Sequence, residues 1–152
     1  PVTMDAPPPP QGASLHVRPS LTQCVGYDDL RSQLAKPRWL VLDARAADRF
    51  RGENELLEAV GGHIPGARNR PFRNNLDAAG FFKPAAQLRE EFTAITGKLP
   101  ASAIVNQCGS GVSACHNLLA MEVAGLTGAA LYPGSWSEWS AQPDTVIATG
   151  NA

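Results

Sequence analysis

A cysteine followed by a glycine-rich turn is the part of this 152-residue sequence best suited to chemistry. Cys108 begins the run Cys-Gly-Ser-Gly-Val-Ser-Ala, which lies between a short apolar segment and one with helical periodicity. Two glycines permit positive φ angles, so successive N–H groups can turn toward one point and form an anion-binding nest at the helix start. The same partial charges favour the thiolate form of a cysteine. The loop therefore predicts a nucleophilic sulfur in an anion cradle. The cradle residues would be Gly109, Ser110, Gly111, Val112 and Ser113.

The same loop is compatible with a cysteine that only packs. Free cysteines are among the most buried residue types. The segment lacks the longer glycine fingerprint of a dinucleotide site or a P-loop. A cysteine phosphatase would need an arginine that closes the loop, and Ser113 and Ala114 stand in that region instead. The loop by itself leaves a catalytic and a structural cysteine equally open.

The strands that would hold this loop are short apolar runs that end in polar or turn residues, a pattern typical of strands buried on both faces. The three clearest runs are residues 39–42, 103–105 and 129–132, and two weaker candidates are residues 15–17 and 67–69. Ligands bind beyond the carboxyl ends of parallel strands. We therefore expect Asp43, Cys108 and Gly134 to share one edge of a sheet.

Segments with helical spacing lie between these strands, and the alternation indicates an α/β fold with a parallel sheet. Tyr27, Leu30 and Leu34 define one such segment, which follows a turn and carries two aspartates near its start. A second helix is predicted to begin near Pro84. Residues 112–124 are apolar on almost every side, which predicts a buried helix that stops at Gly125.

Composition and charge narrow the functional class. Hydrophobic residues make up 43% and charged residues 18%, as in an ordinary globular domain. A net charge of -1 argues against nucleic acid or an anionic membrane as the main partner. No apolar run is long enough to span a bilayer, so we expect neither membrane insertion nor export.

Cysteine usage bears on the compartment and on metals. The three cysteines cannot all pair within one chain, so at least one thiol is free, and we expect a reducing, cytoplasmic location. Cys108 and Cys115 are too far apart for a zinc knuckle, and Cys24 stands alone. We therefore expect no metal and no organic cofactor.

A proline-rich start divides the chain. Residues 1–12 include the run Pro7–Pro10 and are expected to form a flexible linker, while residues 13–152 are expected to form the catalytic domain. A linker in this place raises the question of a preceding domain.

Four motifs in matching order resemble the rhodanese, or sulfurtransferase, family over residues 15–150. They are residues 42–52 (Leu-Asp-Ala-Arg, then Arg-Phe-Arg-Gly), residues 62–67 (Gly-His-Ile-Pro-Gly-Ala), the cysteine loop, and residues 129–139. The loop is similar to that of 3-mercaptopyruvate sulfurtransferases, in which glycine follows the cysteine. The resemblance implies a rhodanese-like fold with five parallel strands and helices on both faces.

The resemblance also implies a function for Cys108. It would take sulfane sulfur from a small anionic donor, thiosulfate or 3-mercaptopyruvate, and become a persulfide. A cyanide ion, a small thiol or a thioredoxin-like protein would then accept the sulfur. Residues 109–113 would hold the charge, with Ser110 beside the nucleophile. A non-catalytic or sulfur-carrier module that binds a partner protein is the alternative, and the intact cysteine with its glycines argues against it.

Arg49 matches the arginine that holds the donor's anionic group in this family, because a guanidinium can bind such a group through two parallel hydrogen bonds. The alternative is a surface ion pair with Asp48 or Glu53. The mercaptopyruvate enzymes carry a second arginine nine residues further on, where this sequence has Glu58. The donor therefore stays open.

The sequence offers three arginines that would offset the charge of Glu58, and they are Arg51, Arg68 and Arg70. Asp43, Arg45 and His63 are expected to have structural roles. The family's tandem members carry the cysteine in their C-terminal half. The resemblance therefore implies that an N-terminal rhodanese domain would supply part of the pocket wall.

Overall fold

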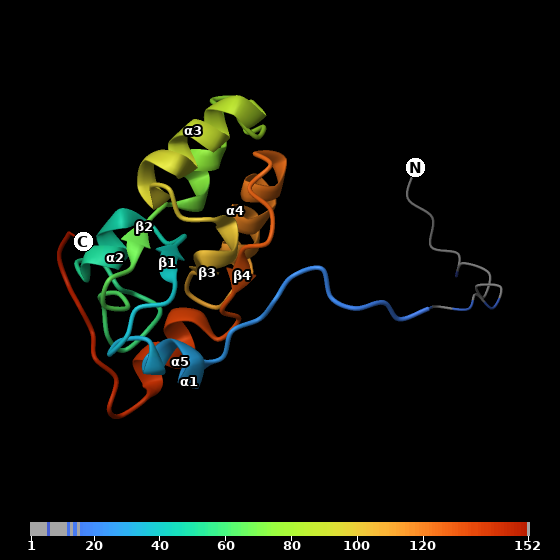
Figure 1. The fold of residues 1–152 in the computed structure, drawn as a ribbon. Helices are drawn as coiled ribbons and strands as arrows, with labels where there is room; N and C mark the ends of the chain where they lie inside the picture. The colour runs from blue at the N-terminus through green and yellow to red at the C-terminus, as the bar shows by residue number, and fades with distance from the viewer. Residues whose placement is uncertain (1–5, 7–11, 13, 15, 152) are drawn as a thin grey trace.

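The computed structural model describes residues 6, 12, 14 and 16–151. Most of the predicted linker, residues 1–12, lies outside the described residues. Residue 15, the first of the weak strand candidate 15–17, lies outside them too. The described chain forms a parallel sheet in the order β2-β1-β3-β4 (Figure 1). The strands are β1 (Leu40–Asp43), β2 (Arg68–Asn69), β3 (Ile104–Gln107) and β4 (Ala130–Leu131).

The prediction of five strands was wrong for the residues described, since the sheet has four. The place beside β4 holds a single parallel bridge between Cys24 and Leu131. Two backbone hydrogen bonds form there, from Val25 to Leu131 at 2.8 Å and from Leu131 to Gln23 at 2.9 Å. Because β4 has only two residues and a helix begins at Tyr27, the pairing has no room to extend.

The helices of the described chain are α1 (Tyr27–Ser32), α2 (Ala47–Arg51), α3 (Ala85–Thr96), α4 (Val112–Val123) and α5 (Ser135–Ala141), with two 3-10 turns, η1 (Phe72–Asn75) and η2 (Ala101–Ala103). Three of them, α1, α3 and α4, lie close to the segments predicted from helical spacing. At the start of α1 the Asp29 carboxylate accepts a hydrogen bond from the Gly26 N–H, as suits the positive end of a helix. Pro84 is the residue that caps α3.

Alternating side chains of the strands build two cores, one on each face of the sheet. Val41 and Val105 pack with the residues of α1, α2 and α5, including Trp136. Leu42 and Ile104 point the other way and pack with α3 and α4. Figure 1 shows the same arrangement, with α3 and α4 above the sheet and α1 and α5 below it. The predicted helices on both faces are confirmed.

Helix α4 is less enclosed than its apolar sequence suggests. Its buried residues recur every three or four positions, as Ala114, Asn117 and Met121 do. Val112, by contrast, is 77% exposed and Leu119 is 54% exposed. A helix in an outer layer covers the sheet with one face only, so an apolar sequence leaves apolar side chains in solvent. Among the described residues, no helix is both long and apolar enough to cross a membrane.

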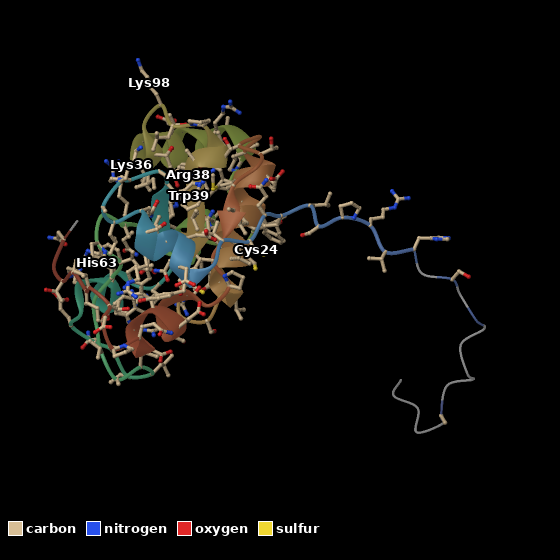
Figure 2. The ribbon with its side chains drawn as sticks, turned by 60° about the horizontal axis from the view of Figure 1, so that its bottom comes forward. Cys24, Lys36, Arg38, Trp39, His63 and Lys98 are labelled. Atoms are coloured by element: carbon tan, nitrogen blue, oxygen red, sulfur yellow. The ribbon has the colours of Figure 1, made fainter. Side chains whose placement is uncertain are left out.

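The Gly-His-Ile-Pro-Gly-Ala motif fixes the segment before β2. His63 stacks on Phe50 with ring centroids 3.8 Å apart, and its Nδ1 lies 2.8 Å from the Phe50 carbonyl oxygen. Its backbone pairs with Ala148, which ties down the C-terminal segment. Figure 2 shows His63 on the side of the domain away from Cys24. The expected structural role of His63 agrees with these contacts.

Gly62→Ala is expected to lower the free energy of unfolding by about 3 kcal/mol. Gly62 has φ +123°, and a Cβ there would lie 2.5 Å from the Ala148 carbonyl oxygen. Gly66→Ala is the matched control, because Gly66 has φ +79° but open space around it, so only about 1 kcal/mol is expected. Urea denaturation measures both, and equal losses would contradict the steric explanation.

An ion-pair network joins the segments on either side of η1 to α3. Arg70 is buried and donates to Glu91 at 2.6 Å, and Lys83 donates to the same carboxylate at 2.9 Å. Burial by itself raises the pKa of Glu91, but hydrogen bonds from Lys83, Arg70 and Gln87 outweigh it and hold this pKa at about 2.

Glu91 therefore stabilises the fold above the ordinary glutamate pKa and loses that contribution as the pH falls from about 4.5 toward 2. Glu91→Gln is expected to flatten the pH dependence of unfolding in that window. Glu90 is an exposed neighbour, and Glu90→Gln is expected to leave the pH dependence of the free energy of unfolding as in wild type. Urea titrations at several pH values compare the slopes, and parallel curves for the wild type and Glu91→Gln would contradict the prediction.

Candidate functional site

Cys108 follows β3 directly and is 2% exposed. Its N–H donates to Ser135 Oγ at 3.1 Å, and that hydroxyl donates to the Tyr132 carbonyl oxygen at 2.8 Å. Its carbonyl oxygen accepts from the Trp136 N–H at 3.0 Å. The cysteine is therefore fastened on both sides to the turn that begins α5.

Gly111 makes the contact between the cysteine loop and that turn possible. It caps α4 with φ +82°, and a Cβ there would lie 2.6 Å from the Pro133 carbonyl oxygen. A residue with a side chain would be strained and would push the two segments apart. The position thus requires glycine for two separate reasons.

The loop keeps backbone donors available. None of the backbone hydrogen bonds formed by the described residues uses the N–H of Gly109, Ser110 or Gly111. Helix α4 begins at Val112, and the first N–H groups of a helix have no partner within it. The predicted cradle of residues 109–113 therefore has free donors beside Cys108.

A pocket of about 450 Å³ opens at this loop. Its lining includes Cys108 and four of the five predicted cradle residues, all but Gly111. The other walls come from the segment after β1 and from η1. They are Arg45, Ala46, Arg49, Leu57, Glu58, Phe72 and Arg73.

Arg45 anchors the pocket from beneath. Its guanidinium donates to Asp43 at 2.6 Å and to the Gly62 carbonyl oxygen at 2.6 Å, and its side chain is 1% exposed. It also lies 4.6 Å from the ring centre of Trp136. Burial raises the pKa of Asp43, and the contacts with Arg45 oppose that rise. The expected structural roles of Asp43 and Arg45 agree with this geometry.

The Arg49 guanidinium lies near the cysteine loop, and its carboxylate partner is neither Asp48 nor Glu53. It binds Glu55 through two hydrogen bonds, 3.1 Å from Nε and 2.7 Å from an Nη nitrogen. A Cβ built on Gly109 would lie 3.8 Å from its guanidinium, so the group faces the cysteine loop. Asp48 accepts from the Arg49 backbone instead, and Glu53 pairs with Arg51.

Sequence reasoning missed Glu55. Its side chain is 4% exposed and lies between two arginines, 3.4 Å from Arg45 and 2.7 Å from Arg49. Burial raises the pKa of Glu55, but hydrogen bonds from Arg49 and from the N–H groups of Leu57 and Glu58 outweigh it, so the pKa is lowered. A carboxylate placed six residues after an arginine in an irregular loop carries no sequence signal for this role.

Glu58 lies on the pocket wall, but the three arginines expected to offset it lie elsewhere. The Ser137 hydroxyl holds Glu58 and also lies 2.8 Å from the Gly109 carbonyl oxygen. Arg51 pairs with Glu53, Arg68 binds the carbonyl oxygen of Ile95, and Arg70 is buried against Glu91. None of these three arginines lines the pocket of Cys108.

A third arginine lines the pocket beside Arg45 and Arg49, namely Arg73 in η1, which sequence reasoning also missed. It follows Phe72, another pocket residue. The sequence gives no periodic pattern for a single 3-10 turn, so nothing in it placed Arg73 opposite the cysteine loop.

The other two cysteines lie outside this pocket. Cys24 and Cys115 line a separate cavity of about 650 Å³ near β4, and the Cys115 thiol donates to the Gly111 carbonyl oxygen at 3.4 Å. Neither lines the pocket of Cys108. In the part of the chain that the structure describes, no three His, Cys, Asp or Glu side chains gather as a metal site.

The family model for the rhodanese-like domain matches residues 27–142. The chain belongs to the rhodanese-like domain family. The match covers the whole sheet and each predicted site residue.

Curated relatives of this rhodanese-like chain are named sulfurtransferases. A probable 3-mercaptopyruvate sulfurtransferase of Pseudomonas aeruginosa is 45% identical over 134 residues, 88% of this chain and 47% of that protein. The 3-mercaptopyruvate sulfurtransferase of Homo sapiens is 39% identical, and the thiosulfate sulfurtransferase of Bos taurus is 37% identical. Each of these two matches covers 82% of this chain and 43% of the relative. The chain thus spans about half the length of these relatives.

Solved structures agree on the fold. The Tum1 protein of Saccharomyces cerevisiae superposes with a TM-score of 0.69 at 29% identity, over 86% of this chain and 47% of that one. The wild-type structure of EanB gives a TM-score of 0.73 at 21% identity, over 85% of this chain and 32% of that one. The second likeness concerns the fold alone.

Glu55→Gln is expected to lower the free energy of unfolding by about 2 to 4 kcal/mol, because it leaves two buried or half-buried arginines short of a carboxylate. Glu53→Gln is the matched control. Its partner Arg51 is also held by two hydrogen bonds, but Glu53 is 55% exposed, so less than about 1 kcal/mol is expected. Chemical denaturation of both variants measures the difference, and a Glu55→Gln loss no larger than the control would contradict the role of Glu55.

Proposed function

We propose that this rhodanese-like domain is a sulfurtransferase in which Cys108 carries the transferred sulfur as a persulfide. The observation that carries the proposal is the position of Cys108, which directly follows a central strand and lines a pocket together with Arg49 and a loop whose N–H groups make no backbone hydrogen bond. The names of the curated relatives support the same reaction. In this proposal residues 109–113 form the anion cradle, and Arg49 holds the donor.

The first half-reaction moves one sulfur atom. The Cys108 thiolate attacks the outer sulfur of thiosulfate, a new S–S bond forms, and the S–S bond of the donor breaks. Sulfite leaves with the bonding electron pair, and Cys108 keeps a persulfide that carries one negative charge. The N–H groups of Gly109, Ser110 and Gly111 make no backbone hydrogen bond, and in this proposal they stabilise that charge without a side chain.

The second half-reaction returns the thiolate. Cyanide attacks the outer sulfur of the persulfide, thiocyanate leaves, and the electron pair of the broken S–S bond stays on Cys108. A thiol, either small or on a thioredoxin-like protein, would accept the sulfur in the same manner. No metal or organic cofactor enters either step.

With 3-mercaptopyruvate as donor, a C–S bond breaks instead. The electron pair goes to carbon, the proton of the donor's thiol ends on that carbon, and pyruvate leaves. Thiosulfate and 3-mercaptopyruvate are both anions, so the same cradle suits both. Glu58 in the pocket wall opposes any anionic donor and is therefore a candidate determinant of the choice.

We also propose that a second rhodanese domain covers the mouth of the pocket in the natural protein. The chain spans 43 to 47% of the relatives named above. Large apolar side chains surround the mouth and are exposed, with Leu56 at 91%, Leu57 at 77% and Val112 at 77%. Leu57 and Val112 line the pocket itself. A covering domain would bury this apolar rim and exclude water from the persulfide.

The thiols support a reducing location. Cys24, Cys108 and Cys115 are all free, and two of them are exposed. Exposed free thiols are typical of proteins kept in a reducing compartment, and we propose the cytoplasm.

Intact-protein mass spectrometry after incubation with thiosulfate or 3-mercaptopyruvate tests the persulfide. Wild type is expected to gain one sulfur atom, because the cradle stabilises the anionic product, and Cys108→Ser is expected to gain none. Cys24→Ser and Cys115→Ser remove the other two thiols and are expected to load like wild type. The donor that loads faster identifies the preferred one.

Two results would contradict the proposal. Loading that persists in Cys108→Ser would assign the sulfur to another thiol. Absence of loading with either donor, while Cys108 still reacts with an alkylating agent, would favour a module that only binds a partner protein.

A further inference from the structure

Three guanidinium groups line the pocket of Cys108, and two of them are already neutralised. Arg45 is held by Asp43 at 2.6 Å, and Arg49 is held by Glu55 at 2.7 Å. Each pair cancels its own charge, so these arginines offer hydrogen bonds to an incoming anion but little net attraction.

Arg73 differs from both. It is exposed, and in residues 16–151 no hydrogen bond or ion pair joins its side chain to a carboxylate. It therefore brings an uncompensated positive charge to the pocket wall.

The backbone that carries Arg73 is firmly held. At the end of η1, the Asn75 amide donates to Asn117 of α4 at 2.7 Å, and Arg70 donates to Asn75 at 3.2 Å. The Arg73 carbonyl oxygen accepts from the Leu76 N–H at 3.1 Å. The backbone thus fixes the place from which the Arg73 side chain extends, while its guanidinium keeps its hydrogen-bond donors available.

Glu58 places a negative charge on the pocket wall, and a positive charge nearby is needed to offset its repulsion of an anionic ligand. Its carboxylate lines the same pocket and is held there by Ser137, so an anion that approaches Cys108 meets a negative charge. Within the pocket lining, only Arg73 offsets this charge without a carboxylate partner of its own among the described residues.

We propose that Arg73 receives the anionic end of the sulfur donor, a carboxylate or thiosulfonate group on a small molecule. This assignment rests on the function proposed above and adds a specificity-determining residue to it. Arg49 then contributes mainly directional hydrogen bonds near the loop, and Arg73 contributes the net attraction.

The charge of the pocket can be measured without sulfur transfer. In a background with Cys24→Ser and Cys115→Ser, Cys108 is alkylated either by iodoacetate, an anion, or by iodoacetamide, which is neutral and of similar size. The ratio of the two rate constants reports the potential at the thiolate and cancels changes in the thiolate's own reactivity.

Arg73→Gln is expected to lower this ratio about three- to ten-fold at low salt, and the effect is expected to shrink as salt rises. Arg73→Lys is expected to keep the ratio, because it keeps the charge. Glu58→Gln is expected to raise it. Arg18→Gln makes the same charge change at an exposed position outside the pocket and serves as the control.

Steady-state kinetics with thiosulfate and with 3-mercaptopyruvate complete the test. Arg73→Gln is expected to raise the KM of the preferred donor by a similar factor with a smaller change in kcat, and Arg73→Lys is expected to restore it. A purely structural role would not be rescued by lysine in this way.

The inference is overturned if Arg73→Gln leaves the alkylation ratio equal to that of Arg18→Gln. Failure of the proposed function gives a different result, namely that wild type accepts no sulfur from either donor. In that case the alkylation ratio still decides on Arg73, because it requires no sulfur transfer.

Discussion

The buried Arg45 guanidinium is the interaction on which the site depends. It joins the end of β1 through Asp43, the motif before β2 through the Gly62 carbonyl oxygen, and α5 through the ring of Trp136. Through Glu55 it also sets the position of Arg49. A charge buried this deeply is tolerable only while all of its partners are present. The segments that Arg45 joins therefore hold one another in place.

The cysteine loop is fastened to this frame from the opposite side. The Cys108 backbone donates one hydrogen bond to the turn at residues 132–136 and accepts another from it. Gly111 allows that turn to approach the cysteine loop. The thiol is thus placed by backbone contacts directly after a central strand, whereas the charged side chains of the pocket come from the segments after β1 and β2, which include α2 and η1.

The sequence predicted the parts that follow regular patterns. The apolar runs placed β1, β3 and β4, and the glycine loop placed Cys108 beside the start of α4. The missed features depend on contacts between segments that are distant or irregular. Glu55 and Arg73 lie in stretches with no periodicity, and the fifth strand failed because β4 is too short to pair with more than Cys24. The exposed face of α4 was not predicted, because an apolar sequence does not show how many faces of a helix pack against the rest of the protein.

The free N–H groups at residues 109–111 have a consequence for how this pocket can change over time. Backbone donors survive almost any substitution except proline, so replacements at Ser110 or Val112 alter the lining while the N–H groups of the loop are kept. Under the proposed function, the groups that would hold a sulfur anion and the side chains that would select its donor can therefore change independently. Substitutions around the mouth would then alter the choice of donor without removing the backbone donors.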